Sequence, residues 1–276
     1  MLANIEREGE EAVRRYAEKL DGWTGDIVLS DADRAAACAR VPQELKDDIQ
    51  FAHGNIRRFA EAQKATMGEC EIEVIPGLIA GQKQIPVSSA GCYVPGGRYS
   101  HMASALMTIT TAKVAGVKHI TAVSPTRPNS GIPDAIVYAM DLCGADLILN
   151  LGGVQAIAAM AKGLFGAKPA DILVGPGNSF VAEAKRMLFG EVGIDMFAVP
   201  TDSLVIADHT AEVETVAWDL VSQAEHGADS PVWLVTTCGA LADGVMARVE
   251  GLISQLPEPN QSAARQAWAD RAEVIL

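Results

Sequence analysis

The chain has 276 residues, of which 49% are hydrophobic and 21% charged, a globular composition with enough apolar side chains for one large domain or two ordinary ones. A formal net charge of −13 without a basic cluster argues against nucleic acid and against anionic membrane surfaces as partners. Small-molecule ligands stay open, because the charge of a local pocket can differ from that of the whole chain.

Cysteine usage and the N-terminal residues indicate the compartment. The five cysteines are scattered and form no CxxC pair, which is typical of reduced thiols and argues against a cysteine-based zinc site. The N-terminal residues have no apolar signal core, and no apolar run is long enough to cross a bilayer. We therefore expect a soluble, cytoplasmic protein.

The first seventy residues have the spacing of helices. Residues 4–20 and 42–66 repeat apolar side chains at helical intervals. From residue 71 to residue 97 the chain is β-branched and interrupted by proline and glycine, which predicts short strands.

Strands and helices alternate regularly from His119 onward. The alternation predicts a parallel sheet with helices on both faces, whose strand-to-helix turns lie along one edge, the usual ligand edge. The predicted strands are residues 119–125, 146–151, 171–175, 202–208 and 231–237, and the predicted helices are residues 134–145, 154–166, 179–190, 211–227 and 239–256.

A domain boundary is expected near Pro200, where two strand-like pieces flank a proline in "IDMFAVPTDSLVIAD". We expect one α/β domain over residues 70–200. The second domain would be discontinuous and combine residues 1–69 with residues 201–276.

Three glycine-rich turns are candidate ligand sites: residues 94–98, 151–156 and 174–179. Glycine lets the backbone approach a ligand closely, and a helix that starts after such a turn can offer free N–H groups to an anion. Gln155 and Asn178 lie at two of these helix starts. Each turn alone can equally be a geometric feature of an α/β sheet, and the dinucleotide fingerprint G-x-G-x-x-G is absent.

The stretch "DLVSQAEHG" places Gln223 and His226 three residues apart near a helix end, so both can point at one object. Imidazole is a common zinc ligand and an amide oxygen a less usual one. Asp219 lies one turn earlier and could support them. The alternative is a polar helix end, where the helix dipole favours a histidine, and two ligands alone do not complete a zinc site.

Five motifs together resemble the histidinol dehydrogenase family, in the family's order: "GCYVPGGRYSHMASALMTITTAKVAGV", "LGGVQAIAAMAKG", "DILVGPGNSFVAEAKR", "IDMFAVPTDSLVIAD" and "DLVSQAEHG". The resemblance covers the whole chain. It implies an α/β protein of two incomplete Rossmann-like domains, with parallel sheets flanked by helices. It also implies a homodimeric alcohol dehydrogenase that uses NAD and Zn²⁺ to oxidise an alcohol through the aldehyde to a carboxylate.

The resemblance also implies roles for particular residues. Tyr93, Gln155 and Asn178 would contact NAD. Gln223 and His226 would be two of four zinc ligands and would hold the substrate together with Thr201. The acid/base Glu-His pair of the family is expected beyond Leu276, so we expect a C-terminally truncated chain that carries no catalytic residue and binds zinc weakly.

Two substrates stay open. After the glycine pair, "GGRYSHMAS" differs from the histidinol enzymes, and "SPTRPNSGIPDAIVYA" and "KGLFG" resemble a paralogous branch that includes sulfopropanediol dehydrogenases. The expected reaction is therefore L-histidinol to L-histidine, or 2,3-dihydroxypropane-1-sulfonate to sulfolactate. Arg98 and His101 are candidates for binding a sulfonate. The alternative is a non-catalytic NAD-binding or interaction module.

Overall fold

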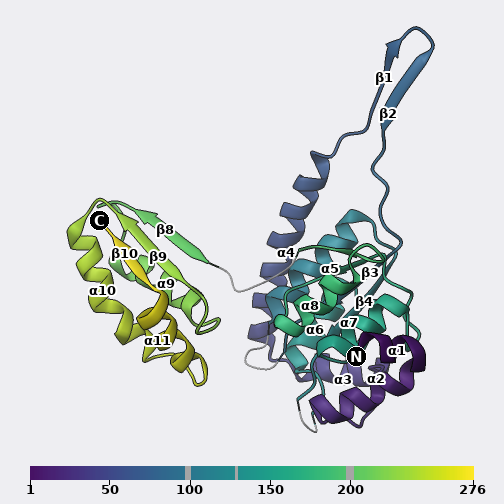
Figure 1. Ribbon diagram of the computed structural model, residues 1–276, viewed down its shortest axis with the longest axis horizontal. Helices are drawn as coiled ribbons and strands as arrows, with labels where there is room; N and C mark the ends of the chain where they lie inside the picture. The colour runs from purple at the N-terminus through teal and green to yellow at the C-terminus, as the bar shows by residue number, and fades with distance from the viewer. Residues whose placement is uncertain (97–100, 128–129, 197–201) are drawn as a thin grey trace. The chain divides into compact units, whose positions relative to one another are not determined.

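The computed structural model describes residues 1–96, 101–127, 130–196 and 202–276 (Figure 1). The chain divides into two compact units, Met1–Phe197 and Ala198–Leu276. Each unit has its own parallel sheet and its own helices, which confirms the predicted α/β class. Among the described residues, no helix is long and apolar enough to cross a membrane.

The first unit is built on a five-stranded sheet in the order β5-β4-β3-β6-β7, with every neighbouring pair parallel. The strands are β3 (Ser89–Tyr93), β4 (His119–Ser124), β5 (Leu147–Asn150), β6 (Ile172–Val174) and β7 (Gly193–Ile194). Sequence order runs outward from β3 to one edge and then from β6 to the other, so the sheet is doubly wound.

Helices cover both faces of this sheet, as the alternation of its side chains requires. Cys92, Ala122 and Ile148 belong to the core on one face, with α5 (Met102–Ala115) and α6 (Asp134–Cys143). Tyr93, Val123 and Leu149 belong to the core on the opposite face, with α7 (Gly153–Lys162) and α8 (Ser179–Leu188).

The N-terminal helices extend both layers of the first unit. The helices α1 (Leu2–Glu8) and α2 (Glu10–Tyr16) and the π-helical turn η1 (Ala17–Asp21) pack beside α7. The helices α3 (Asp31–Arg40) and α4 (Gln43–Ala65) pack on α5 and α6. The single helix expected over residues 4–20 is interrupted at Gly9, which has a φ of +61°.

The described contacts of residues 1–65 thus lie within the first unit, whereas the sequence led us to group residues 1–69 with residues 201–276. The physical reason is that the apolar stripes of α1, α2 and α4 match the two helical layers of the five-stranded sheet. The proposed discontinuous domain stays a prediction.

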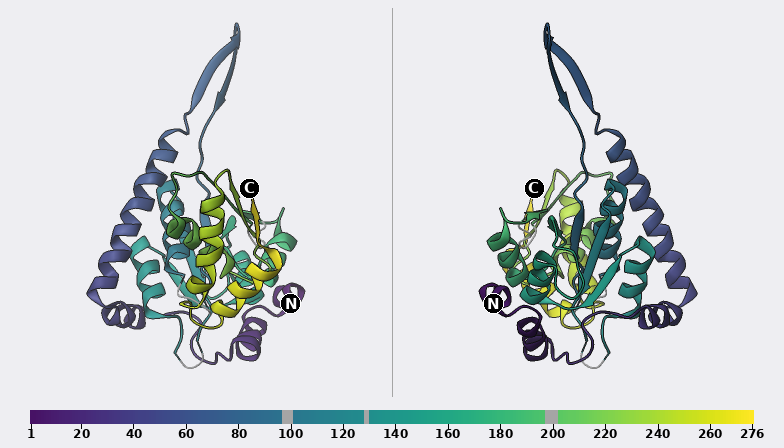
Figure 2. Two further views of the ribbon diagram at one scale, coloured as in Figure 1. Left: turned by 90° about the vertical axis from the view of Figure 1, so that its left-hand side faces the viewer. Right: turned by 90° about the vertical axis from the view of Figure 1, so that its right-hand side faces the viewer.

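A β-hairpin extends beyond the end of α4 (Figures 1 and 2). Its strands β1 (Cys70–Ile75) and β2 (Leu78–Gln82) pair antiparallel, and every residue in them is exposed. Exposed apolar side chains include Ile72, Ile75 and Ile79.

The second unit is a three-stranded parallel sheet in the order β10-β9-β8. Its elements are β8 (Ser203–Ala207), α9 (Val213–Ala224), β9 (Val232–Thr236), α10 (Gly239–Ile253), α11 (Asn260–Arg271) and β10 (Glu273–Ile275). The three helices form one core with the side chains of Val205, Leu234 and Val274. Leu204 and Ile206, which alternate with Val205, are exposed.

The strands and helices predicted from residue 119 onward all form, with bounds that shift by a few residues. The sequence did not assign α5, α11, β7 or β10. For α5 the reason is visible, because the helix is apolar on nearly all sides and has no helical stripe to read.

Candidate functional site

The strand order changes direction between β3 and β6, and in doubly wound sheets the carboxyl ends of these two strands are the usual ligand edge. β3 ends at Tyr93, and β6 is followed by the turn Gly175–Asn178. The turn Gly152–Gly153 follows the edge strand β5, which β4 separates from β3, and starts α7. Two of the glycine-rich turns found in the sequence therefore lie at the carboxyl edge of one sheet.

The turn after β6 depends on Gly175. Its φ is +115°, and a Cβ atom added there would lie 2.0 Å from the carbonyl oxygen of Tyr93. Glycine is therefore required both by the backbone conformation and by the close approach of β3.

An ion pair with a buried lysine stabilises the same turn. The ammonium group of Lys185, whose side chain is 1% exposed, pairs with Asp195 and donates to the carbonyl oxygen of Gly175 at 3.0 Å. Asp195 in turn accepts from the N–H groups of Gly175 and Met196, both at 2.7 Å. The carboxylate thus ties α8 to the turn that precedes it.

Asn178 caps α8. Its side-chain oxygen accepts from the N–H of Val181 at 3.1 Å, and the residue is exposed. Capping leaves the two N–H bonds of the side-chain amide for other partners.

Side chains of the protein itself hold the start of α7. The phenolic oxygen of Tyr93 accepts from the N–H of Gly153 at 3.1 Å. The carboxylate of Asp21, at the end of η1, accepts from Nε2 of Gln155 at 2.8 Å. The N–H of Gly153 at this helix start is therefore already paired.

Burial governs the titration of these groups. It raises the pKa of Tyr93 to about 12, because a buried phenolate would lose its hydration, and the hydrogen bond from the N–H of Gly153 offsets this only in part. Burial also raises the pKa of Asp21, while the hydrogen bonds from Gln155 and Gly152 favour its ionised form.

Several buried polar atoms near this edge have no hydrogen-bond partner among the described residues. They are Ser124 Oγ, Thr126 Oγ1, Asn150 Oδ1 and Gln155 Oε1. Ser124 and Asn150 are neighbours in the β4–β5 register at the carboxyl ends of these strands. Buried polar atoms are rarely left unpaired, so this edge fits a ligand that forms hydrogen bonds.

Gln223 and His226 lie in the second unit, at the end of α9. Gln223 is in the last turn of the helix, and the N–H of His226 donates to the carbonyl oxygen of Gln223 at 3.1 Å. His226 is exposed and lies just beyond the helix. In the part of the chain that the structure describes, no three His, Cys, Asp or Glu residues gather as metal ligands. The described residues therefore do not complete a zinc site.

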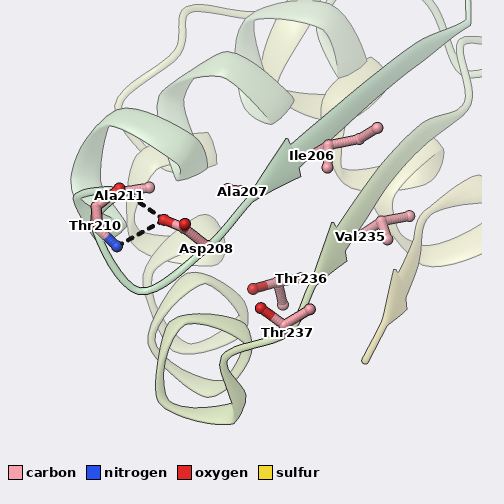
Figure 3. A pocket seen from close by; sticks show the side chains of 8 residues that line it. All are labelled: Ile206, Ala207, Asp208, Thr210, Ala211, Val235, Thr236 and Thr237. Carbon is pink, nitrogen blue, oxygen red and sulfur yellow. Dashed lines mark hydrogen bonds between the residues drawn. The ribbon is translucent and has the colours of Figure 1, made fainter.

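The second unit also has a hollow at the carboxyl ends of β8 and β9, with a volume of about 460 Å³ (Figure 3). Asp208 lies at its rim and accepts from both the N–H and the hydroxyl of Thr210, and the hydroxyl lowers the pKa of the carboxyl group most. Thr236 and Thr237 supply further hydroxyls.

Comparison with known proteins decides the family. The model of the histidinol dehydrogenase family matches residues 1–276. The chain belongs to the histidinol dehydrogenase family.

Curated relatives and a solved structure agree with this family. A histidinol dehydrogenase homolog and a sulfopropanediol 3-dehydrogenase, both from Ruegeria pomeroyi, are 64% and 62% identical over the whole chain. The crystal structure of histidinol dehydrogenase from Elizabethkingia anophelis is 38% identical, with a TM-score of 0.92. The chain spans 64%, 63% and 63% of the lengths of these three proteins.

Within this family fold, the predicted cofactor residues Tyr93 and Gln155 meet at one turn, because both sit beside Gly153. Asn178 starts the helix that follows the neighbouring strand. Thr201, the predicted substrate residue, lies outside the described residues, as does Arg98. The roles of the site residues stay predictions.

Sequence reasoning missed Asp21, Lys185 and Asp195. Asp21 is 134 positions from its partner Gln155, and no local motif surrounds it. A lysine in an amphipathic helix is usually exposed to solvent, and no sequence pattern indicates that Lys185 is buried.

Proposed function

We propose that the chain is the larger part of an NAD-dependent dehydrogenase that oxidises an alcohol to a carboxylate through an aldehyde. The observation that carries the proposal is 62% identity, over the full 276 residues, to a relative named for dehydrogenation of a sulfonated diol. The unpartnered polar atoms at the carboxyl edge of the first unit support a cofactor there.

In this proposal the first unit binds NAD at the switch point between β3 and β6. Tyr93 and Gln155 would contact it from the start of α7, and Asn178 from the start of α8. NAD would accept the hydride removed from the carbinol carbon. The chain's own task at this edge is to bind and orient the cofactor, which the two fixed glycine turns make possible.

The same proposal assigns Gln223 and His226 to a zinc site and to substrate, together with Thr201. Since the described residues supply only two ligands, we derive no chemical step from zinc. The general acid and base likewise have no assigned residue in this chain. A homodimer and a cytoplasmic location remain part of the proposal.

For the substrate, we favour 2,3-dihydroxypropane-1-sulfonate over L-histidinol. The chain is 62% identical to the sulfopropanediol enzyme and 38% identical to the solved histidinol dehydrogenase. The test is the whole reading frame that contains these 276 residues, expressed and assayed with NAD⁺ and each alcohol in turn. Faster NADH formation from the sulfonated diol supports the choice, whereas turnover of histidinol alone contradicts it.

The second candidate is a non-catalytic NAD-binding module, which the unpartnered polar atoms at the carboxyl edge of the first unit would serve equally well. Calorimetry tests whether NAD⁺ binds to the 276-residue chain and to the protein encoded by the whole reading frame. NAD⁺ binding by the whole protein, without turnover of either alcohol, would support the module. Turnover would reject it.

A further inference from the structure

Asp21 connects the N-terminal segment of the chain to the cofactor edge. It lies at the end of η1 and reaches the start of α7, where it accepts from the side-chain amide of Gln155 at 2.8 Å. Gln155 is 1% exposed, so its amide has few alternative partners.

The carboxylate of Asp21 fixes the orientation of the side-chain amide of Gln155. An ionised carboxylate only accepts hydrogen bonds, so the amide must present its NH₂ group to Asp21. The carbonyl oxygen Oε1 then faces away from Asp21, and it is one of the buried atoms without a partner. An unmade hydrogen bond of this kind destabilises the folded protein, and a ligand donor would recover the loss.

Asp21 also occupies the position where a helix start usually receives an anion. Its negative charge lies at the positive end of α7, near the N–H of Gly152, which favours the ionised carboxylate. The phenolic oxygen of Tyr93 accepts a hydrogen bond from the N–H of Gly153. A second negative group, such as a phosphate, would meet a carboxylate instead of free N–H groups.

We propose that Asp21 is a positioning residue of the cofactor site. It fixes the amide of Gln155 with Oε1 available and fills the anion position at α7, so this corner of the site accepts an uncharged hydrogen-bond donor and not a phosphate. On NAD such donors are the ribose hydroxyls, the adenine amino group and the carboxamide N–H. This inference rests on the proposed NAD-dependent function and concerns how the same site is built.

The first test measures affinity in the 276-residue chain. We expect Asp21→Ala to raise the Kd for NAD⁺ about 10-fold or more, because a hydrogen bond to a charged group is lost from Gln155. Asp21→Asn should keep part of the affinity, since its carbonyl oxygen can still accept from Gln155. The control Glu18→Gln removes an exposed carboxylate from the same turn and should leave the Kd unchanged.

A double-mutant cycle separates positioning from general destabilisation. If Asp21 acts through Gln155, adding Asp21→Ala to Gln155→Ala should raise the Kd no further than Gln155→Ala alone. Additive losses would overturn the inference. Circular dichroism confirms that each variant is folded, and Asp21→Asn, which nearly keeps the shape of the side chain, serves if Asp21→Ala does not fold.

The second test needs no cofactor. In the wild-type chain, the amide N–H of Gly152 should exchange slowly with solvent, and Asp21→Ala should speed its exchange. Inorganic pyrophosphate should leave the NMR signals of Gly152 and Gly153 unshifted. Unchanged exchange in the variant, or a pyrophosphate-induced shift in the wild type, would overturn the inference.

A third test identifies which group of NAD⁺ donates the hydrogen bond to Oε1 of Gln155. The acetylpyridine analogue of NAD⁺ lacks the carboxamide N–H. If it binds the wild type about 10-fold more weakly than NAD⁺ but binds Gln155→Ala equally well, the carboxamide is the donor. Equal binding of both to the wild type excludes the carboxamide and leaves a ribose hydroxyl or the adenine amino group as the donor. If the wild type takes up no NAD⁺, the proposed function fails and this inference falls with it, whereas tight binding by Asp21→Ala refutes this inference alone.

Discussion

The ion pair between Lys185 and Asp195 allows a stability prediction in which the two partners are unequal. The Lys185 side chain is 1% exposed, whereas that of Asp195 is 31% exposed. Asp195→Ala leaves a buried ammonium group with the carbonyl oxygen of Gly175 and removes the acceptor of two N–H groups. Removing one partner of a buried pair costs about 3–5 kcal/mol, and we expect this variant to lose that much.

Lys185→Met should cost less. The carboxylate that it leaves behind keeps the N–H groups of Gly175 and Met196 and stays in contact with water, and methionine fills much of the space of the lysine stem. We expect a loss of about 1–3 kcal/mol. The double variant should lose less than the sum of the two single losses, because the pair is broken only once.

Chemical denaturation followed by circular dichroism measures these losses. Hydrogen exchange of peptides that cover residues 172–196 assigns them to the first unit, which matters because two units can unfold separately. The reasoning is refuted if Lys185→Met is as destabilising as Asp195→Ala. It is also refuted if both losses stay below about 1 kcal/mol, the value typical of an exposed pair.

Three further outcomes test the site. Gly175→Ala should cost about 3 kcal/mol or more in denaturation, because its Cβ would meet the carbonyl oxygen of Tyr93. The control Gly190→Ala also has a positive φ but nothing within 4 Å, and should cost only about 1 kcal/mol. Because the folded pKa of Tyr93, about 12, lies above its ordinary value of 10.0, the unfolded chain ionises first, and stability should fall as pH rises through this interval. Denaturation of Tyr93→Phe should lack this part of the pH dependence, and an unaltered dependence would contradict the assignment. Finally, chelation of Zn²⁺ should leave the melting temperature of the 276-residue chain unchanged, and so should His226→Ala, since Gln223 and His226 alone do not complete a site. A clear drop on chelation would show a closed zinc site.

Much of the fold could be predicted because its signals are local. Apolar spacing gives α4 to within one residue at each end and α9 to within three, and apolar runs give β4 and β9. The glycine turns after β5 and β6 were located from sequence because glycine at a strand end marks a conformation that other residues avoid. Strand and helix alternation then predicts a parallel sheet, together with the edge where its turns meet.

Other elements could not be predicted because their sequence signal is weak or absent. The helix α5 has apolar side chains on its exposed face as well, such as Met107, so no polar face marks its period. The N-terminal helices are clearly amphipathic, yet amphipathicity does not say which sheet their apolar stripe covers. That choice depends on shape and on the other layers present.

For this protein, the sequence by itself determined the element types, the α/β class, the family and the positions of the glycine turns. Only the tertiary structure decided that Asp21 faces Gln155, that Tyr93 caps Gly153 and that Lys185 is buried against Asp195. The physical reason is that periodicity and turn chemistry act between near neighbours in the chain. Hydrogen bonds between buried side chains depend on which distant segments the core brings together, and no local pattern encodes that.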